Sequence, residues 1–469
     1  MKLHKMWSFR KLTRKSSKSE NTPKSLTEVS AASLGETESF AASIIFHSGK
    51  AGKCYILSSS GAKNGLLNLM GEVSEKILQA VLQSKEDYSV SESFQPLLER
   101  CSAPSCILAF INDKMFSFSK GENHIYAFDL NNQILHEISD SFLALKHFTG
   151  YIYLISSQYC QEIINYLLRS SRENLLPSEI SAGCINLARE MGIKDFSISL
   201  IGMSIPVVNT SSLKRLKLYG ACSDIGLKRA VNEDSVIASN VKYSSSGKTW
   251  SSFILLVADG AGGHLHGEEA SREALKLSFV EILKSNIISS GDKETLLFTL
   301  RNIVQSINER IASLRERKRS DLATTLTMAF ILGNDVFVAH CGDSRAYMLK
   351  GNDLSLITED HKYVMDLVKA GIMTLEEAKF SPQRNILTSA LGMRSPRVDF
   401  KHFSLEGDEI LLLCSDGLTD LVSEEEIKAY LKHYKYPSLV SQALINLANN
   451  RGGFDNISVA VLVPGSLIF

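Results

Sequence analysis

Short apolar runs recur in the second half of the chain, and two of them end in the same way. Residues 253–257 (FILLV) lead to an Asp-Gly pair at 259–260, and residues 411–414 (LLLC) lead to an Asp-Gly pair at 416–417. Apolar runs of this length, bounded by turn-forming residues, predict buried strands. Each aspartate is therefore expected where a strand leaves the core, beside a glycine that lets the backbone turn sharply.

Three more acids lie near the ends of predicted strands. Asp343 follows the apolar run 336–339, Asp455 precedes another apolar run, and Asp234 closes the polar segment 229–234. One aspartate at a strand end is usually a turn residue, but five within about two hundred residues indicate a polynuclear metal site. Carboxylates beside flexible backbone carbonyls favour a hard cation such as Mg²⁺ or Mn²⁺.

A series of short polar motifs runs in order through the second half. They are RAVNED at 229–234, DGAGGHLHGE at 259–268, TT at 324–325, GDSR at 342–345, LITEDH at 356–361, NILTSALG at 385–392, SDGL at 415–418 and DN at 455–456. Each motif is weak alone, but their joint occurrence is specific. In this order they make residues 217–464 resemble the metal-dependent serine/threonine protein phosphatases of the protein phosphatase 2C family, in their bacterial-type form.

The resemblance implies two Mn²⁺ or Mg²⁺ ions, with a weaker third ion. Four residues match the metal-binding aspartates of the family: Asp234, Asp259, Asp416 and Asp455. Gly260 matches a position whose carbonyl contributes, Glu233 an acid that reaches a metal through water, and Asp343 the acid at the third ion. A phosphate monoester is dianionic and hydrolyses very slowly, so a pair of cations that activates a shared water suits the expected reaction.

Arg229 matches the phosphate-binding arginine of the family, and with the four aspartates it completes the expected catalytic residues. It precedes Asp234 closely, so an extended segment would bring both side chains toward one pocket. A guanidinium pairs two phosphate oxygens in a fork, which suits substrate capture. The alternative for Arg229 is a surface salt bridge.

The sequence assigns no general acid. Ala261 stands where animal members of the family carry histidine, a position at which bacterial-type members commonly have another residue. His264 matches the bacterial-type pattern, with a loop-capping role as the alternative. His361 follows an acidic pair and is a candidate structural residue.

Residues 360–395 match the flap that covers the site in this family. The apolar spacing predicts a helix over 362–370, and Thr374 is expected to cap a second helix. A flap beside the metals is where a protein substrate would be read.

Residues 40–204 repeat the order of apolar and polar segments seen in the second half. AFI at 109–111 corresponds to AFI at 329–331, and INLA at 185–188 corresponds to INLA at 445–448. We interpret the first half as a shortened copy that has lost its metal ligands. The alternative is that two unrelated α/β domains share this order. The substituted positions are Ser60 for Asp259, Glu122 for Asp343 and Ser157 for Asp416.

The composition divides the chain into four segments. Residues 1–38 are rich in Lys, Arg and Ser and predict a disordered basic tail. The degenerate domain is expected over 39–205, a linker over 206–216 and the catalytic domain over 217–469. The tail is expected to be solvated, with weak attachment to an anionic membrane surface as the alternative.

Charge and cysteine content narrow the classes of partner. The 469 residues carry a formal net charge of zero, which gives no reason to expect nucleic acid. No apolar run approaches the ~18 residues of a membrane span. The eight cysteines are scattered and include no Cys-x-x-Cys pair, which indicates buried thiols in a reducing cytoplasm.

The expected fold is α/β (α+β): a four-layer α-β-β-α sandwich of two antiparallel sheets, present twice. The expected function is hydrolysis of phosphoserine and phosphothreonine on proteins by a metal-activated water. The first half would regulate the second, dock on it or mediate dimerisation. The alternatives are a binding scaffold without turnover and a phosphatase for small phosphate esters.

Overall fold

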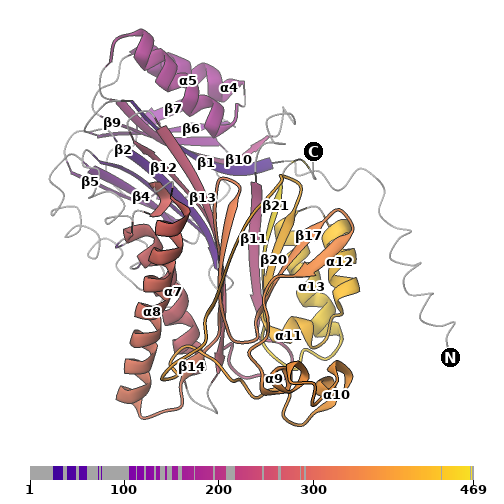
Figure 1. The fold of residues 1–469 in the computed structure, drawn as a ribbon. Coiled ribbons are helices and arrows are strands. Elements are labelled where there is room, and N and C mark those ends of the chain that lie inside the picture. Colours follow the sequence, from indigo (N-terminus) through magenta and orange to yellow (C-terminus); the bar gives the residue numbers. More distant parts are fainter. Residues whose placement is uncertain are drawn as a thin grey trace.

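Two antiparallel sheets form the second half of the chain in this computed structural model (Figure 1). The structure describes residues 217–464 with gaps at 246–247, 262–265, 286, 290–291 and 435, and before residue 207 it describes chiefly the strands and helices given below. One sheet runs β19 (Asp399–Ser404), β16 (Asp335–Cys341), β15 (Leu326–Leu332), β13 (Lys248–Ala261) and β12 (Asp234–Ser245), with the short β14 (Ala323–Thr324) also paired to β13. The other runs β11 (Lys217–Asp224), β21 (Ile457–Pro464), β20 (Ile410–Cys414), β17 (Arg345–Lys350) and β18 (Asp353–Leu356).

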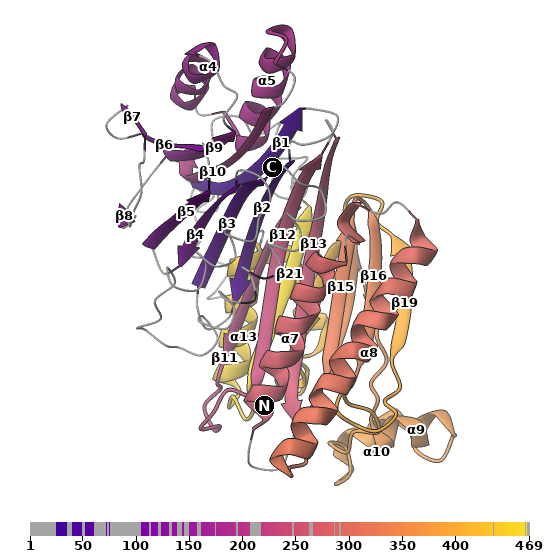
Figure 2. The ribbon, with the colours of Figure 1, turned by 90° about the vertical axis from the view of Figure 1, so that its left-hand side faces the viewer.

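Strand β15 shows why the apolar runs of this half are continuous. Met328 and Phe330 belong to the core shared with α7 (Gly267–Lys284) and α8 (Lys293–Lys318), whereas Ala329 and Ile331 belong to the core between the two sheets. Because both faces of the strand are covered, neither face is polar. Figure 2 shows α7 and α8 lying across the outer face of this sheet.

The other sheet is covered by α12 (Glu424–His433) and α13 (Pro437–Asn450). Val440, Leu444 and Ala448 recur every four residues on α13 and share one buried core with Leu412 of β20. This spacing is the apolar stripe of a helix that packs on a sheet. The second half is therefore a mixed α/β structure in which each antiparallel sheet has helices packed on one face.

Short helices complete the second half, namely η1 (Ile287–Ser289), α9 (Tyr363–Lys369), α10 (Leu375–Phe380) and α11 (Asp416–Thr419). The two helices expected in the flap are confirmed as α9 and α10. Thr374 caps α10, because its side chain accepts a hydrogen bond from Glu377 N while the Glu377 carboxylate accepts one from Thr374 N. None of the helices in the described residues is long and apolar enough to cross a membrane.

The first half contributes a sheet of its own, which runs β1 (Ser25–Leu34), β10 (Phe196–Pro206), β9 (Gly150–Ser156), β6 (Asn123–Asp129) and β7 (Ile134–Glu137). Helices α4 (Gln161–Arg172) and α5 (Pro177–Glu190) pack on it. Strand β1 lies in the segment expected to be a disordered tail. Its backbone is paired along β10, a long-range contact that local composition does not reveal.

The remaining strands of the first half extend the sheet of the second half. Strands β2 (Phe40–Ser48), β3 (Gly52–Ser60), β4 (Ser105–Ile111), β5 (Lys114–Lys120) and β8 (Leu143–Ala144) continue it beyond β12. β2 pairs antiparallel with β12, from Ser48 opposite Ile237 to Phe40 opposite Ser245. The two halves thus share one 11-stranded sheet, which runs from β8 to β19 (Figure 2).

The shared sheet predicts a specific cross-link between the halves. Ser43 lies directly opposite Lys242 in the β2–β12 register, and residues directly opposite in an antiparallel pair have Cβ atoms about 5 Å apart. Ser43→Cys combined with Lys242→Cys should form an intramolecular disulfide under mild oxidation, identified by mass spectrometry of the linked peptides. The control pairs Ser43→Cys with Asp353→Cys on β18, which should stay unlinked. Equal linkage in both variants would contradict the shared sheet.

Candidate active site

Strands β12 and β13 bring the first two predicted ligands together. Asp234 and Asp259 are direct partners across these strands. The neighbouring TT motif holds the backbone of Asp259: its N–H donates to Thr325 Oγ1 at 2.9 Å, and its carbonyl accepts from Thr325 N at 2.8 Å and Thr324 Oγ1 at 2.9 Å. The motif therefore fixes the end of β13, where the carboxylate leaves the sheet.

The Asp416 segment meets the Asp455 segment at a close backbone approach. Asp416 begins α11 directly after β20, and Ser415 donates a 2.6 Å hydrogen bond to Asp234 Oδ2. A Cβ on Gly417 would lie 2.0 Å from the carbonyl oxygen of Asn456, so only glycine fits there. The glycine of the SDGL motif thus allows α11 to begin against the segment that carries Asp455.

The acids influence one another strongly. Burial raises the pKa of Asp259 well above its usual range, and the charges of Asp234, Asp416 and other acids add to the rise. Burial also raises the pKa of Asp416 well above its usual range, with Asp343 adding to the rise and Lys362 opposing it. Carboxylates that raise one another's pKa form a single electronegative cluster.

Glu233 and the carbonyl of Gly260 approach the same glycine at the start of α7. A Cβ on Gly267 would lie 2.4 Å from Glu233 Oε1 and 2.9 Å from Gly260 O, and a Cβ on Gly260 would lie 2.1 Å from Gly267 O. Both oxygens therefore lie at one edge of the acidic cluster. His264 falls in the loop 262–265, outside the described residues.

The donor set fits a divalent cation in its chemistry. Within the ranges that the structure describes, no three His, Cys, Asp or Glu side chains are gathered closely enough to enclose one ion. The acids nevertheless supply oxygen donors only, and positive charge would relieve the repulsion that raises the pKa of Asp259 and Asp416. Individual ligand roles remain predictions.

Arg229 lies at the open side of this cluster. Its Nη2 is 2.7 Å from Asp455 Oδ2, and 47% of the arginine side chain is exposed. Burial lowers the pKa of Arg229, but the neighbouring Asp455 outweighs burial, so the net shift is upward. The structure thus joins the expected phosphate-binding residue to one of the expected metal ligands, and leaves its side chain accessible from solvent.

Lys362 is the residue of the site that the sequence did not single out. Its Nζ lies 2.7 Å from Asp343 Oδ2 and 3.6 Å from Asp416 Oδ2, in a buried position. Burial lowers the pKa of Lys362, but Asp343 and Asp416 outweigh burial, and the net shift is upward. The only sequence signal was its place directly after the LITEDH motif.

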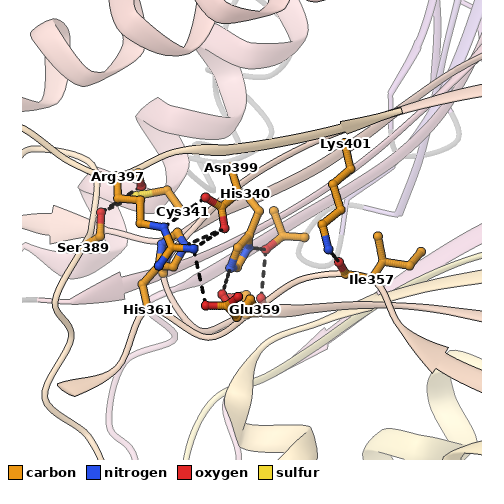
Figure 3. Close-up of polar contacts among 12 residues, drawn as sticks. His340, Cys341, Ile357, Glu359, His361, Ser389, Arg397, Asp399 and Lys401 are labelled. Carbon is orange, nitrogen blue, oxygen red and sulfur yellow. Dashed lines mark hydrogen bonds and ion pairs between the residues drawn. The ribbon is translucent and has the colours of Figure 1, made fainter. Parts of the chain in front are cut away.

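The GDSR and LITEDH motifs fasten the flap to the sheet. Arg345 donates to both oxygens of Asp360, from Nε at 2.9 Å and from Nη2 at 2.7 Å. His361 accepts from Gly342 N through Nδ1 and lies 3.1 Å from Asp399 Oδ2 through Nε2 (Figure 3). Both ring nitrogens are engaged, so these contacts agree with the structural role expected of His361.

His340 is a second buried histidine, and its ring packs against that of His361 at a tilt of 50°, with 4.9 Å between the ring centroids. Its Nδ1 is 2.9 Å from Thr327 Oγ1, and its Nε2 is 3.0 Å from the carbonyl oxygen of Glu359 (Figure 3). A carbonyl only accepts, so Nε2 carries the proton and the neutral ring satisfies both contacts. Burial, reinforced by His361, lowers the pKa of His340 to about 3.

Comparisons with known proteins agree with the motifs. The profile of the Protein phosphatase 2C family matches residues 230–446. Protein phosphatase PhpP of Streptococcus pneumoniae serotype 2 is 34% identical over 242 residues, which cover 51% of this chain and 94% of PhpP. Serine/threonine phosphatase stp of Listeria welshimeri is 37% identical over 213 residues, 45% of this chain and 83% of that protein. The catalytic domain of serine threonine protein phosphatase PstP, solved in complex with 2 manganese ions, is 32% identical, with 53% of this chain and 97% of that chain covered and a TM-score of 0.44.

The buried His340 predicts an acid-sensitive fold. The unfolded chain protonates His340 below about pH 6.5, whereas the folded chain resists this protonation. The contribution of neutral His340 to the free energy of unfolding is therefore complete above about pH 6.5 and is lost as the pH falls toward 3. The loss from this group should be on the order of 3 kcal/mol between about pH 6.5 and pH 4, measured by urea unfolding. His340→Gln should lower stability at neutral pH but flatten the acid slope. If the free energy of unfolding fell with pH in parallel for wild type and His340→Gln, His340 would not be the source of the acid sensitivity.

Proposed function

This chain belongs to the protein phosphatase 2C family of serine/threonine phosphatases, and from that premise we propose that residues 217–464 remove phosphate from phosphoserine and phosphothreonine on proteins with the help of two divalent metal ions. The observation that supports this most is the acidic cluster. Asp234, Asp259 and Asp416 come from separate strand ends and still influence one another's charge. A fold that needed only stability would not gather them.

Each residue has a distinct part in the proposed reaction. Asp234, Asp259, Asp416 and Asp455 would hold the two ions, with Gly260 and Glu233 at their edge. Bound Mn²⁺ or Mg²⁺ would neutralise the phosphate and lower the pKa of the attacking water. Thr325 and Ser415 would keep the carboxylates in place through the hydrogen bonds to Asp259 N and Asp234 Oδ2.

Arg229 would capture the phosphate group before hydrolysis. Only one of its nitrogens is bonded to Asp455, and the side chain faces solvent. Guanidinium and phosphate pair through two parallel hydrogen bonds, which orients the ester as well as binding it. The flap formed by α9 and α10 is joined to the cluster by Lys362, and we propose that it contacts the protein part of the substrate.

We further propose that the first half is a second copy of the same fold. Its sheets run β2-β3-β4-β5-β8 and β1-β10-β9-β6-β7, and those of the second half run β12-β13-β15-β16-β19 and β11-β21-β20-β17-β18. Taken in chain order, the strands occupy equivalent places in both halves. Two unrelated α/β domains would share an alternation of elements but not this whole order.

Helices α5 and α13 support the same proposal. Each is 14 residues long and begins with proline in its first turn. A constant shift along the chain superimposes their buried positions. The matched buried pairs are Pro177 with Pro437, Ile180 with Val440, Ser181 with Ser441, Cys184 with Leu444, Ile185 with Ile445 and Ala188 with Ala448.

The strand registers support the proposed loss of metal chemistry from the first half. Phe40 pairs with Ser60 at the strand ends where the second half pairs Asp234 with Asp259. A phenyl ring and a hydroxyl cannot balance two divalent ions, so this copy would bind none. Glu122 and Ser157 lie outside the described residues. We propose that the first half acts instead through its contact with the second half along β2 and β12.

The metal assignment predicts loss of turnover in Asp259→Asn. The substitution removes one charge from the cluster and should abolish Mn²⁺-dependent hydrolysis of para-nitrophenyl phosphate and of a phosphothreonine peptide, with an unchanged circular dichroism spectrum. Asp353→Asn, on the exposed strand β18, is the matched control and should behave as wild type. Near wild-type turnover of Asp259→Asn at saturating Mn²⁺ would refute the assignment.

Substrate capture predicts a separate kinetic effect for Arg229→Ala. The phosphate loses its forked partner while the acids remain, so KM for a phosphothreonine peptide should rise on the order of 10-fold or more with a smaller change in kcat. The exposed neighbour Lys228 provides the control Lys228→Ala. An unchanged KM would make Arg229 a purely structural partner of Asp455.

A further inference from the structure

The Lys362 ammonium lies where two acids of the cluster converge. It is 2.7 Å from Asp343 Oδ2 and 3.6 Å from Asp416 Oδ2. Only 10% of the lysine side chain and 7% of the Asp343 side chain are exposed. Most ion pairs of lysine are solvated at the surface, whereas this one is enclosed.

The backbone around Lys362 directs the side chain inward. Lys362 forms an isolated antiparallel bridge with Leu387, and its neighbours are fixed by two further hydrogen bonds. Tyr363 N donates to Ile386 O at 2.9 Å, and Thr388 N donates to the carbonyl of His361 at 2.8 Å. The position is therefore held on both sides, and the ammonium is a built part of the site.

We infer that the Lys362 ammonium is a resident cation that takes the place of a third divalent ion between Asp343 and Asp416. The inference rests on the proposed two-ion function and revises the expectation of a weaker third ion at Asp343. An ammonium has three N–H donors and can serve two carboxylates at once. A divalent ion held by Asp343 would lie within a few ångströms of a buried like charge, and would bind only if Lys362 were displaced.

A resident cation also fixes the flap without metal in that position. Lys362 immediately precedes α9, so its contact with Asp343 and Asp416 ties the start of the flap to the ends of β16 and β20. Lys362 would thus supply a positive charge that is always present, whereas the charge of a bound third ion would depend on the concentration of free metal.

Metal counting on the full chain tests the inference. Isothermal calorimetry and electron paramagnetic resonance of added Mn²⁺ should give two ions per chain for wild type and three for Lys362→Met, which keeps the length of the side chain but removes its charge. Adding Asp343→Asn to Lys362→Met should return the count to two. Lys369→Met, which changes an exposed lysine of the neighbouring α9, should stay at two.

The outcomes separate this inference from the proposed function. Three ions in wild type, or two ions in a folded Lys362→Met, would overturn the resident cation and leave the two-ion reaction standing. No bound ion in wild type would overturn the proposed metal use itself. If Lys362→Met does not fold, Lys362→Ser provides the neutral variant and should bind three ions, while Lys362→Arg keeps the charge and should bind two.

Discussion

Repulsion between buried carboxylates is the constraint around which the second half is built. The pKa values of Asp259 and Asp416 are raised because burial and the charges of neighbouring acids, Asp234 among those beside Asp259, both oppose their ionised forms. Hydrogen bonds from neighbouring strands and side chains hold these aspartates in place. The backbone of Asp259 is bonded to the TT strand, and Asp234 accepts a hydrogen bond from Ser415. The apolar layers on both sides supply the stability that this arrangement costs.

The sequence predicted that these carboxylates converge because the ends of strands can be recognised from neighbouring residues in the chain. An apolar run followed by Asp-Gly identifies the residue that leaves the core. A glycine at such a place predicts a close backbone approach, and the structure shows one at Gly417 and one at Gly260. The sequence signal for the second flap helix was also local, since Thr374 and Glu377 form a capping box within one turn. Features of this kind depend on neighbours in the chain and can be predicted from it.

Other features depend on contacts between distant segments and were not predictable. Lys362 looks like an ordinary surface lysine at the start of a helix until the fold places Asp343 and Asp416 beside it. Strand β1 resembles a polar tail until β10 supplies its hydrogen-bond partners. The pairing of β2 with β12 has no local signal either, because any strand edge offers the same unpaired N–H and C=O groups.

The junction of β2 with β12 gives the molecule a mechanical property as well as a shape. Ile45 lies opposite Asn240 and Phe46 opposite Ser239, and in the proposed duplication each of these pairs maps onto the other when the halves are exchanged. The two copies would therefore meet about a local twofold axis, as a dimer tied into one polypeptide. β12 carries Asp234 just beyond its last pair with β2, at Ile237. Because β12 is paired with β2 and carries Asp234 at its end, we expect a change in the twist of β2 to shift a carboxylate of the acidic cluster, as bending one part of an elastic plate shifts the rest.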